Sequence, residues 1–273
     1  MVQTRGEERR RPVRALLAGQ IERPFDAVVL TCKAYDLASA LDAIAPAVGP
    51  ASVVVPLLNG LAHLDALDAR FGPARVLGGL AYIATALGED GIIRHASPTD
   101  TLLFGDRSGR ITPPVQALAE AFAATPVAAR ASTDILQDLW EKWCMLAAGA
   151  ALTCLMRGTV GEVMATEDGA SVAVALIAET RAVAAGFGRA PRPAAAEQAR
   201  RTLTDPQSRW AASMMRDIER GAPRVEAGHI VGDLIRRGRQ AGVAAPLLEA
   251  AYCHLQVYNA RGAARRAGNG ATP

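Results

Sequence analysis

Residues 26–60 read DAVVLTCKAYDLASALDAIAPAVGPASVVVPLLNG, and this stretch decides the fold. Two continuous apolar runs, Asp26 to Thr31 and Ser52 to Leu58, contain adjacent valines, which is typical of parallel strands buried on both faces. Between them, residues 34–48 place leucine, isoleucine and valine at three- and four-residue spacing, as an amphipathic helix does. The sequence therefore predicts a strand–helix–strand unit with two parallel strands.

The segments that follow predict how this unit is extended. After Asn59-Gly60 we expect a short helix over 61–71, then strands at 76–86, 92–95 and 101–104, the first two joined by a turn at 88–91. From about residue 131 the pattern becomes helical, with helices predicted at 135–156, 170–187, 193–203, 206–220, 226–241 and 246–260. We therefore expect an α/β fold, an incomplete Rossmann-like parallel sheet with a mixed edge (1–130), then an all-α domain (131–260) and a frayed tail (261–273).

Composition excludes several classes of protein. The longest uncharged apolar run, residues 143–156, is too short to span a bilayer, and no secretory signal pattern is present. The 4 cysteines are scattered without metal-ligand spacing, so we expect no metal site and a reducing, cytoplasmic location. The basic termini lack interleaved aromatic residues, and the net charge is only +3. We therefore expect neither a membrane nor a nucleic acid as partner.

Lysine is rare in this chain. Of the 30 basic residues, only Lys33 and Lys142 are lysines, and the rest are arginines. Unlike arginine, a buried lysine can release its proton near neutral pH. One explanation is that the two lysines are present because this proton chemistry is needed, and the simple alternative is coding bias. The positions of the two lysines must distinguish these explanations.

Both lysines, and one asparagine, occupy suggestive positions. Lys33 and Asn59 each follow a predicted parallel strand, so both would lie at the sheet edge where α/β proteins bind ligands. An Asn-Gly pair is also an ordinary turn. Lys142, in LWEKW, lies where its helix becomes wholly apolar. It either extends to the surface or faces a crevice, where desolvation would suit it to general acid catalysis.

Other polar residues carry weaker signals. Ser213 in SMMRD lies one helical turn before Asp217. Such a pair is more often a solvent-exposed part of the surface than a functional site. The histidines show no spacing typical of a catalytic triad or metal site, and we interpret them as structural: His63, His95, His229 and His254.

Four segments in order resemble the ketopantoate reductase (2-dehydropantoate 2-reductase) family. They are CKAYD, VVVPLLNG, LWEKW with the later Gly161-Glu162, and SMMRDIERGAPRVE, and the resemblance extends from about residue 24 to 260. It implies NADPH-dependent reduction of a 2-oxo acid, ketopantoate to pantoate or a related substrate, in pantothenate biosynthesis. It is also compatible with a homodimer.

The resemblance assigns roles to individual residues. It implies that residues 1–130 form a partial NADP-binding domain and that 131–260 form a helical catalytic and substrate domain. Lys142 would donate the proton, which would stabilise the developing alkoxide. The other implied roles are substrate binding by Asn59, Lys142 and Ser213, and cofactor binding by Lys33, Asn59, Ala84 and Glu226.

Three features depart from the family pattern. No G-x-G-x-x-G turn precedes Lys33, which would deprive the cofactor pyrophosphate of its usual anchor. Leu146, Ala150 and Val160 stand where pantoate-forming members carry asparagines. Glu226 lies one residue later than the pattern requires, and Val225 occupies the position by strict count.

The missing glycine turn leaves a second hypothesis open. The chain could be a catalytically inactive, N-terminally truncated family member that acts only as a helical dimerisation module. A G-x-G-x-x-G segment encoded upstream in the same reading frame would instead favour the reductase.

Overall fold

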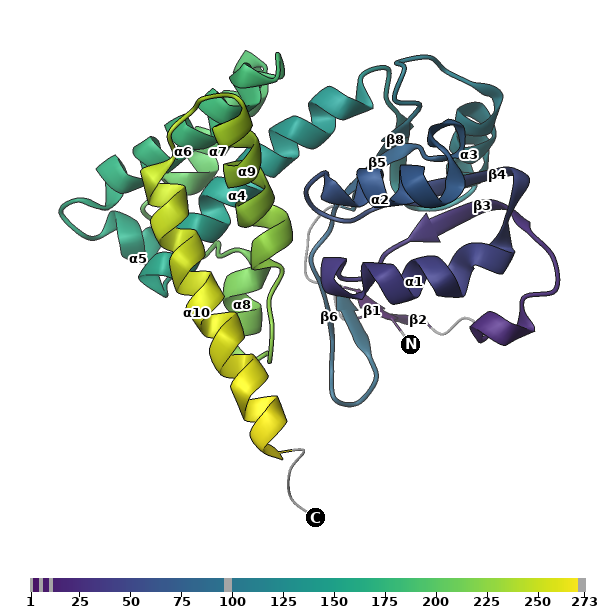
Figure 1. Cartoon of the computed structure of the whole chain (residues 1–273), viewed down its shortest axis with the longest axis horizontal. Helices are drawn as coiled ribbons and strands as arrows, with labels where there is room; N and C mark the ends of the chain where they lie inside the picture. The colour runs from purple at the N-terminus through teal and green to yellow at the C-terminus, as the bar shows by residue number, and fades with distance from the viewer. Residues whose placement is uncertain (1, 5–6, 10–11, 96–99, 270–273) are drawn as a thin grey trace. The chain divides into compact units, whose positions relative to one another are not determined.

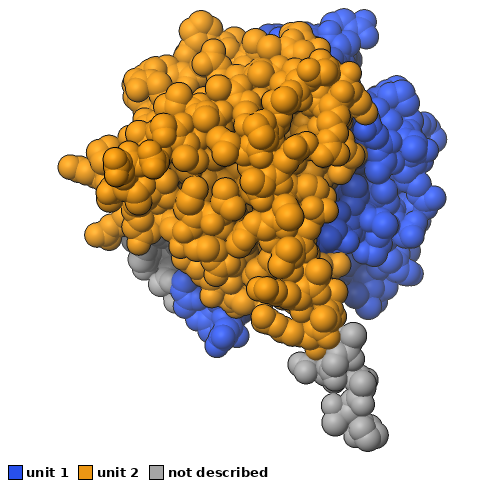
Figure 2. All heavy atoms as spheres, turned by 60° about the vertical axis from the view of Figure 1, so that its left-hand side comes forward, with its two compact units in different colours: residues 1–58, 63–136 blue, residues 59–62, 137–273 orange. Residues whose placement is uncertain are grey.

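The computed structural model describes residues 2–4, 7–9, 12–95 and 100–269 (Figure 1). The chain forms two compact units (Figure 2). Unit 1 comprises Met1–Leu58 and His63–Leu136, and unit 2 comprises Asn59–Ala62 and Gln137–Pro273. The short segment Asn59–Ala62 therefore belongs with the helices, although both of its neighbours along the chain belong to unit 1.

Unit 1 is built on the predicted parallel pair of strands. Strands β3 (Phe25–Leu30) and β4 (Val48–Pro56) are parallel, with Leu30 opposite Pro56, and helix α1 (Leu37–Ile44) connects them. The three valines at 53–55 are buried, which explains why this strand is apolar on both faces. The strand–helix–strand prediction is confirmed.

The sheet continues with a mixed edge, as predicted. A parallel bridge joins Val54 to Val76, and the Leu77 N–H donates to the Val54 carbonyl at 3.0 Å. From there β5 (Gly78–Tyr82) pairs antiparallel with β8 (Thr101–Gly105), and β8 pairs parallel with β9 (Ala128–Ala131). The two pairing directions in one sheet confirm the expected Rossmann-like sheet with a mixed edge.

A helix that the sequence pattern did not predict covers part of this sheet. Helix α3 (Pro113–Ala123) places Val115 in a core with Val53, Val55, Leu77 and Phe104. The pattern misses α3 and β9 because both are rich in alanine, whose small side chain gives little periodic contrast. Their burial is decided by contact with the sheet.

A smaller sheet in unit 1 has the strand order β2-β1-β7-β6. Its members are β1 (Val2–Thr4), β2 (Glu7–Arg9), β6 (Thr85–Leu87) and β7 (Ile93–His95). The β6–β7 hairpin uses the predicted turn at 88–91, where the Gly91 N–H donates to the Gly88 carbonyl at 3.0 Å. Helix α2 (Ala62–Phe71) also matches its predicted position.

Unit 2 is helical. Its helices are α4 (Ile135–Met156), which begins in unit 1, α5 (Val160–Met164), α6 (Gly169–Gly186), α7 (Pro193–Leu203), α8 (Ser213–Glu219), α9 (Asp233–Gln240) and α10 (Pro246–Asn269). Among the described residues, α6 alone has the length and hydropathy of a membrane span. However, Glu179 on α6 accepts hydrogen bonds from the Leu247 and Leu248 N–H groups, which ties α6 to the start of α10.

Helix α8 is shorter than the predicted helix at 206–220. The segment before it is used in tertiary hydrogen bonds, because the Ser208 and Trp210 carbonyls accept from the Gly161 and Val160 N–H groups at 2.8 and 2.9 Å. These bonds cap the start of α5 and keep residues 208–212 out of a helical conformation.

The last two predicted helices also need correction. Residues Gly228–Gly232 form a π-helical turn before α9, instead of one continuous helix over 226–241. Helix α10 continues to Asn269, so the expectation of a frayed tail from residue 261 is wrong for 261–269, while 270–273 lie outside the described residues. A contact explains the extension, because the Arg266 Nη1 donates to the Pro223 carbonyl at 2.8 Å.

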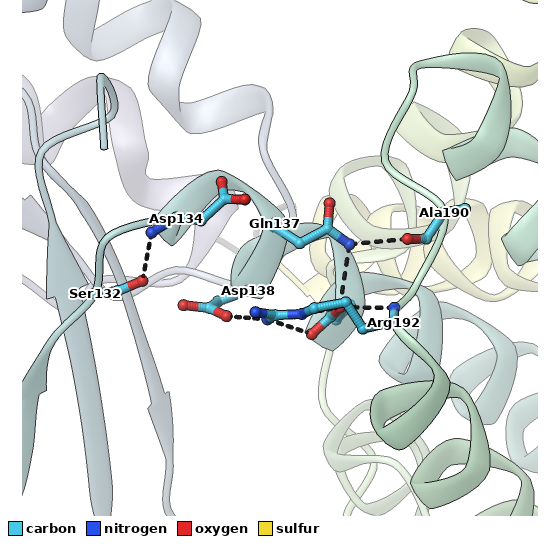
Figure 3. Close-up of polar contacts among 7 residues, drawn as sticks. Ser132, Asp134, Gln137, Asp138, Ala190 and Arg192 are labelled. Atoms are coloured by element: carbon cyan, nitrogen blue, oxygen red, sulfur yellow. Dashed lines mark hydrogen bonds and ion pairs between the residues drawn. The ribbon is translucent and has the colours of Figure 1, made fainter. Parts of the chain in front are cut away.

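An arginine joins the loop before α7 to α4 (Figure 3). The Arg192 Nε donates to Glu141 Oε1 at 2.6 Å, and the same guanidinium contacts Asp138. Gln137 adds two bonds, donating to Glu141 at 3.1 Å and to the Ala190 carbonyl at 2.9 Å. Burial alone would raise the pKa of Glu141, but the bonds from Arg192 outweigh it and hold this pKa below its usual value.

We expect Arg192→Gln to lower the free energy of unfolding at pH 7 by roughly 1–3 kcal/mol, because the mostly buried Glu141 carboxylate loses its charged partner. A lowered folded-state pKa stabilises the fold above the unfolded pKa, and this contribution is lost as pH falls through the folded pKa. The difference between variant and wild type should therefore shrink in urea unfolding at pH 3.

Arg200→Gln serves as the control for this experiment, because Arg200 pairs with Glu197 on the exposed surface of α7. Its effect should stay below about 0.5 kcal/mol at both pH values. Equal losses for the two variants would contradict the role given to Arg192.

Candidate functional site

Two predicted cofactor residues lie in unit 1. Lys33 directly precedes a short 3-10 helix (Ala34–Asp36) after β3, and its side chain is half-buried. Ala84 lies between β5 and β6 and is also half-buried. The Leu57 N–H donates to the Leu30 carbonyl at 2.9 Å, so the chain leaves β3 and β4 at the same edge of the sheet. This arrangement of parallel strand ends is the one at which α/β sheets bind nucleotides.

The other predicted residues belong to unit 2: Asn59, Lys142, Ser213 and Glu226. Ser213 is the first residue of α8 and is exposed. Glu226 is half-buried just before the π-helical turn, and its carbonyl accepts the His229 N–H at 3.1 Å. Val225 is buried, and both its N–H and its carbonyl bond to the Asn259 side chain. Of the two candidates for the family's glutamate position, only Glu226 has a side chain with polar chemistry.

Lys142 is buried in the middle of α4, with an exposed fraction of only 7%. Of the two alternatives that the sequence left open for Lys142, this burial argues against extension to the surface. Burial disfavours the charged ammonium, and this desolvation lowers the pKa of Lys142 to about 8. A lysine with such a pKa is mostly protonated at pH 7 and releases its proton more readily than an exposed lysine. These are the properties of a general acid.

The Asn59-Gly60 turn packs against His229. Gly60 has a φ of 82°, and a Cβ atom there would lie 3.0 Å from the His229 carbonyl oxygen and 3.1 Å from its ring. Both the left-handed backbone and the close approach therefore require glycine. The prediction of a turn at this Asn-Gly pair is consistent with this geometry.

His229 also makes a polar contact with Asn59. Burial lowers the pKa of His229, while the Glu226 and Asp233 carboxylates and a hydrogen bond to the Asn59 backbone raise it. Since this bond favours the charged ring, the imidazole donates and the Asn59 carbonyl accepts. The structure thus bonds the Asn59 backbone to the His229 imidazole, and the Glu226 carboxylate is near enough to favour the charged ring.

Trp143 connects α4 to this group. Its indole Nε1 donates to the Ile230 carbonyl at 2.8 Å in the buried interior, and Ile230 follows His229 in the π-helical turn. A π-helical turn changes the regular i→i−4 bonding, so its carbonyls can bond outside the helix. Lys142, the neighbour of Trp143, is thereby held on the element that is bonded to the His229 turn.

Sequence reasoning missed both His229 and Trp143 as parts of this arrangement. The sequence pattern indicates a structural role for His229, because its spacing to other histidines and to carboxylates is not that of a catalytic triad or metal site. A usable signal was present in GHIVG, where two glycines interrupt a helical pattern close to Glu226. Among the described residues, no group of three or more His, Cys, Asp or Glu side chains could hold a metal ion.

We expect His229→Ala to loosen the Asn59-Gly60 turn, because the Asn59 carbonyl loses its donor. Losing one hydrogen bond of roughly 0.5–1.5 kcal/mol should make backbone amides at 60–62 exchange with deuterium about 2- to 10-fold faster. His254→Ala, at another half-buried histidine of unit 2, should leave this exchange unchanged. Unchanged exchange in His229→Ala would show that the imidazole does not support the turn.

Comparison with family models covers most of the chain. The model described as "Ketopantoate reductase PanE/ApbA" matches residues 1–109. The model described as "Ketopantoate reductase PanE/ApbA C terminal" matches residues 134–259. The two matched ranges follow one another in the order expected for a single family member.

Individual proteins agree with these matches. "Uncharacterized oxidoreductase YkpB" from Bacillus subtilis (strain 168) is 37% identical over 236 residues, which cover 86% of this chain and 78% of the relative. A 2-dehydropantoate 2-reductase from Mesorhizobium japonicum is 29% identical over 266 residues, covering 90% of this chain and 80% of that protein. The crystal structure of a PanE/ApbA family ketopantoate reductase from Ralstonia eutropha JMP134 matches with a TM-score of 0.84 at 25% identity, covering 96% of this chain and 85% of that one.

The order of the motifs, the Rossmann-like sheet followed by helices, and these sequence and structural matches lead to one conclusion: the chain belongs to the ketopantoate reductase family of oxidoreductases.

Proposed function

We propose that this protein is a nicotinamide-dependent reductase of 2-oxo acids, with NADPH as cofactor and Lys142 as the general acid. The observation that carries the proposal is the burial of Lys142, which lowers its pKa to about 8 in a member of an oxidoreductase family. A charged group is costly to bury, so its retention there favours a chemical role over a structural one.

Lys142 suits the proton-transfer half of such a reduction. Reducing a keto group places negative charge on the carbonyl oxygen, and an ammonium group close to that oxygen stabilises the developing charge. Burial strengthens this interaction because little water screens it. Transfer of the Nζ proton to the oxygen then gives the alcohol and leaves a neutral lysine.

The chain offers residues suited to the cofactor. The bound nicotinamide supplies the hydride. The parallel strand ends of β3 and β4 provide the kind of edge at which dinucleotides bind, and Lys33 follows β3 there with a positive charge for a phosphate. We assign cofactor contacts to Lys33, Asn59, Ala84 and Glu226. In this proposal residues 1–130 form the partial nucleotide-binding domain and 131–260 the catalytic and substrate domain.

The remaining assignments concern the substrate. Asn59 and Ser213 would hydrogen-bond the 2-oxo acid and orient its keto oxygen toward Lys142. The turn that carries Asn59 is held by His229, so Asn59 is constrained before the substrate arrives. Such preorganisation lowers the entropic cost of orienting the substrate.

We further propose that the substrate is more apolar than ketopantoate. Ala150 and Val160 are buried and Leu146 is half-buried, so none of these positions offers the amide found in pantoate-forming members. Without partners at these three positions, the additional polar groups of a polar substrate would lose their water without replacement.

The function can be tested by following the oxidation of NADPH or NADH at 340 nm with a panel of 2-oxo acids. The cofactor concentration is varied into the millimolar range. We expect turnover with NADPH and a higher kcat/KM for bulky apolar 2-oxo acids than for ketopantoate. If ketopantoate gives the highest kcat/KM, the substrate proposal is wrong. Absence of turnover with every 2-oxo acid and both cofactors would favour the inactive helical module.

We expect Lys142→Ala to lower kcat by at least about 10²-fold, the usual contribution of positioned acid catalysis. Lys142→Arg should do the same, because arginine keeps the charge but cannot release a proton near neutral pH. In the wild type, kcat should fall as pH rises through about 8, where Lys142 loses the proton that it must donate.

Lys33→Arg is the matched control, because it alters the other lysine of the chain. It should mainly raise the KM for NADPH and leave the alkaline limb of the kcat profile in place. A Lys142→Arg variant that keeps more than about a third of the wild-type kcat would rule out Lys142 as the proton donor.

A further inference from the structure

A pocket of about 450 Å³ lies between α10 and the loop that follows α8. It is lined by Gly221, Ala222, Pro223, Tyr258, Arg261, Gly262, Arg265 and Arg266. All these residues belong to unit 2, and none of them has a role in the proposed reaction. The volume lies within the range typical of small-molecule sites and is far larger than a single water requires.

Side chains of α10 hold the loop wall of this pocket in place. The Tyr258 hydroxyl donates to the Ala222 carbonyl at 2.5 Å, and Arg266 Nη1 donates to the Pro223 carbonyl at 2.8 Å. Gly262 lets the loop approach closely, because a Cβ atom there would lie 2.0 Å from the Pro223 oxygen. The wall of the pocket is therefore fixed by hydrogen bonds and close packing within unit 2.

The lining carries positive charge without a compensating carboxylate. It contains three arginines and no aspartate or glutamate among the described residues. Elsewhere in unit 2, arginines form ion pairs with nearby carboxylates, as Arg192 does with Glu141, Arg237 with Asp233 and Arg239 with Glu249. The pocket thus has an excess of positive charge that an anion would neutralise.

Arginine geometry indicates the kind of anion. A guanidinium presents several N–H donors in a planar fork that matches phosphate oxygens, and three such groups suit a ligand with at least two negative charges. Tyr258, Ala222 and Pro223 add apolar surface, which a bare inorganic ion would not use. Because Arg266 already bonds to the loop, Arg261 and Arg265 are the two with the freer guanidinium groups.

We propose that this pocket binds a phosphorylated organic molecule with two or more phosphate charges, held by Arg261 and Arg265. The site is separate from the residues of the proposed reaction, so binding there can be measured without turnover. The molecule's source, a nucleotide or a sugar phosphate, is left to the experiment.

Isothermal titration calorimetry with inorganic pyrophosphate tests the charge recognition. We expect one pyrophosphate bound per chain, and at least about tenfold weaker binding in the double variant Arg261→Gln/Arg265→Gln. The control, Arg200→Gln/Arg201→Gln, removes the same charge from the exposed surface of α7 and should change the affinity less than twofold. Circular dichroism should show equal helix content in both variants, since all four side chains are exposed.

ADP and fructose 1,6-bisphosphate are titrated in parallel to identify the organic part. The proposal is supported if either molecule binds more tightly than pyrophosphate and this binding is lost in Arg261→Gln/Arg265→Gln but retained in the control. The molecule that does so then identifies the ligand class. No pyrophosphate binding, or equal weakening in both double variants, would overturn the site. Binding of both organic phosphates no tighter than pyrophosphate would overturn the claim that the pocket holds an organic group.

Discussion

The buried hydrogen bond from the Trp143 indole to the Ile230 carbonyl is the contact that ties α4 to the turn beside the proposed site. It joins the interior of α4 to the π-helical turn Gly228–Gly232, whose bonding pattern differs from that of a regular helix. Through this one bond the helix that carries Lys142 is tied to the turn that carries His229. Its burial makes it costly to break, because both the indole N–H and the carbonyl would be left unsatisfied away from water.

The burial of a lysine inside α4 lowers the stability of the fold but suits the proton transfer proposed for it. Desolvation lowers the pKa of Lys142 to about 8, so folding at pH 7 must bury a largely protonated ammonium group. Between that pKa and the ordinary value near 10.5, the unfolded chain binds more protons than the folded one, so the cost of burying this group falls as pH rises. The same burial that costs stability produces an acid with a useful proton affinity.

Arginines supply the positive charge in the other electrostatic contacts described above. Arg192 forms ion pairs with two carboxylates of α4. Arg237 pairs with Asp233, and its guanidinium carbon lies 5.6 Å from the centre of the Trp143 ring. A permanently charged, planar group suits such contacts because it forms several bonds at once and never loses its proton. In the pocket beside α10, by contrast, the lining has arginines without carboxylates, which marks it as a place where a ligand supplies the negative charge.

The sequence alone predicted the parallel pair β3–β4 and the limits of α4, because strand burial and helix periodicity are local patterns. The family, and the residues proposed for the reaction, came from the resemblance of four short motifs to ketopantoate reductases. Tertiary contacts decided the rest. Helix α8 is short because Ser208 and Trp210 bond to the start of α5, and α10 extends to Asn269 where Arg266 bonds to Pro223. The contact between Asn59 and His229 likewise joins residues that are about 170 positions apart in the chain, a separation over which local sequence patterns carry no information.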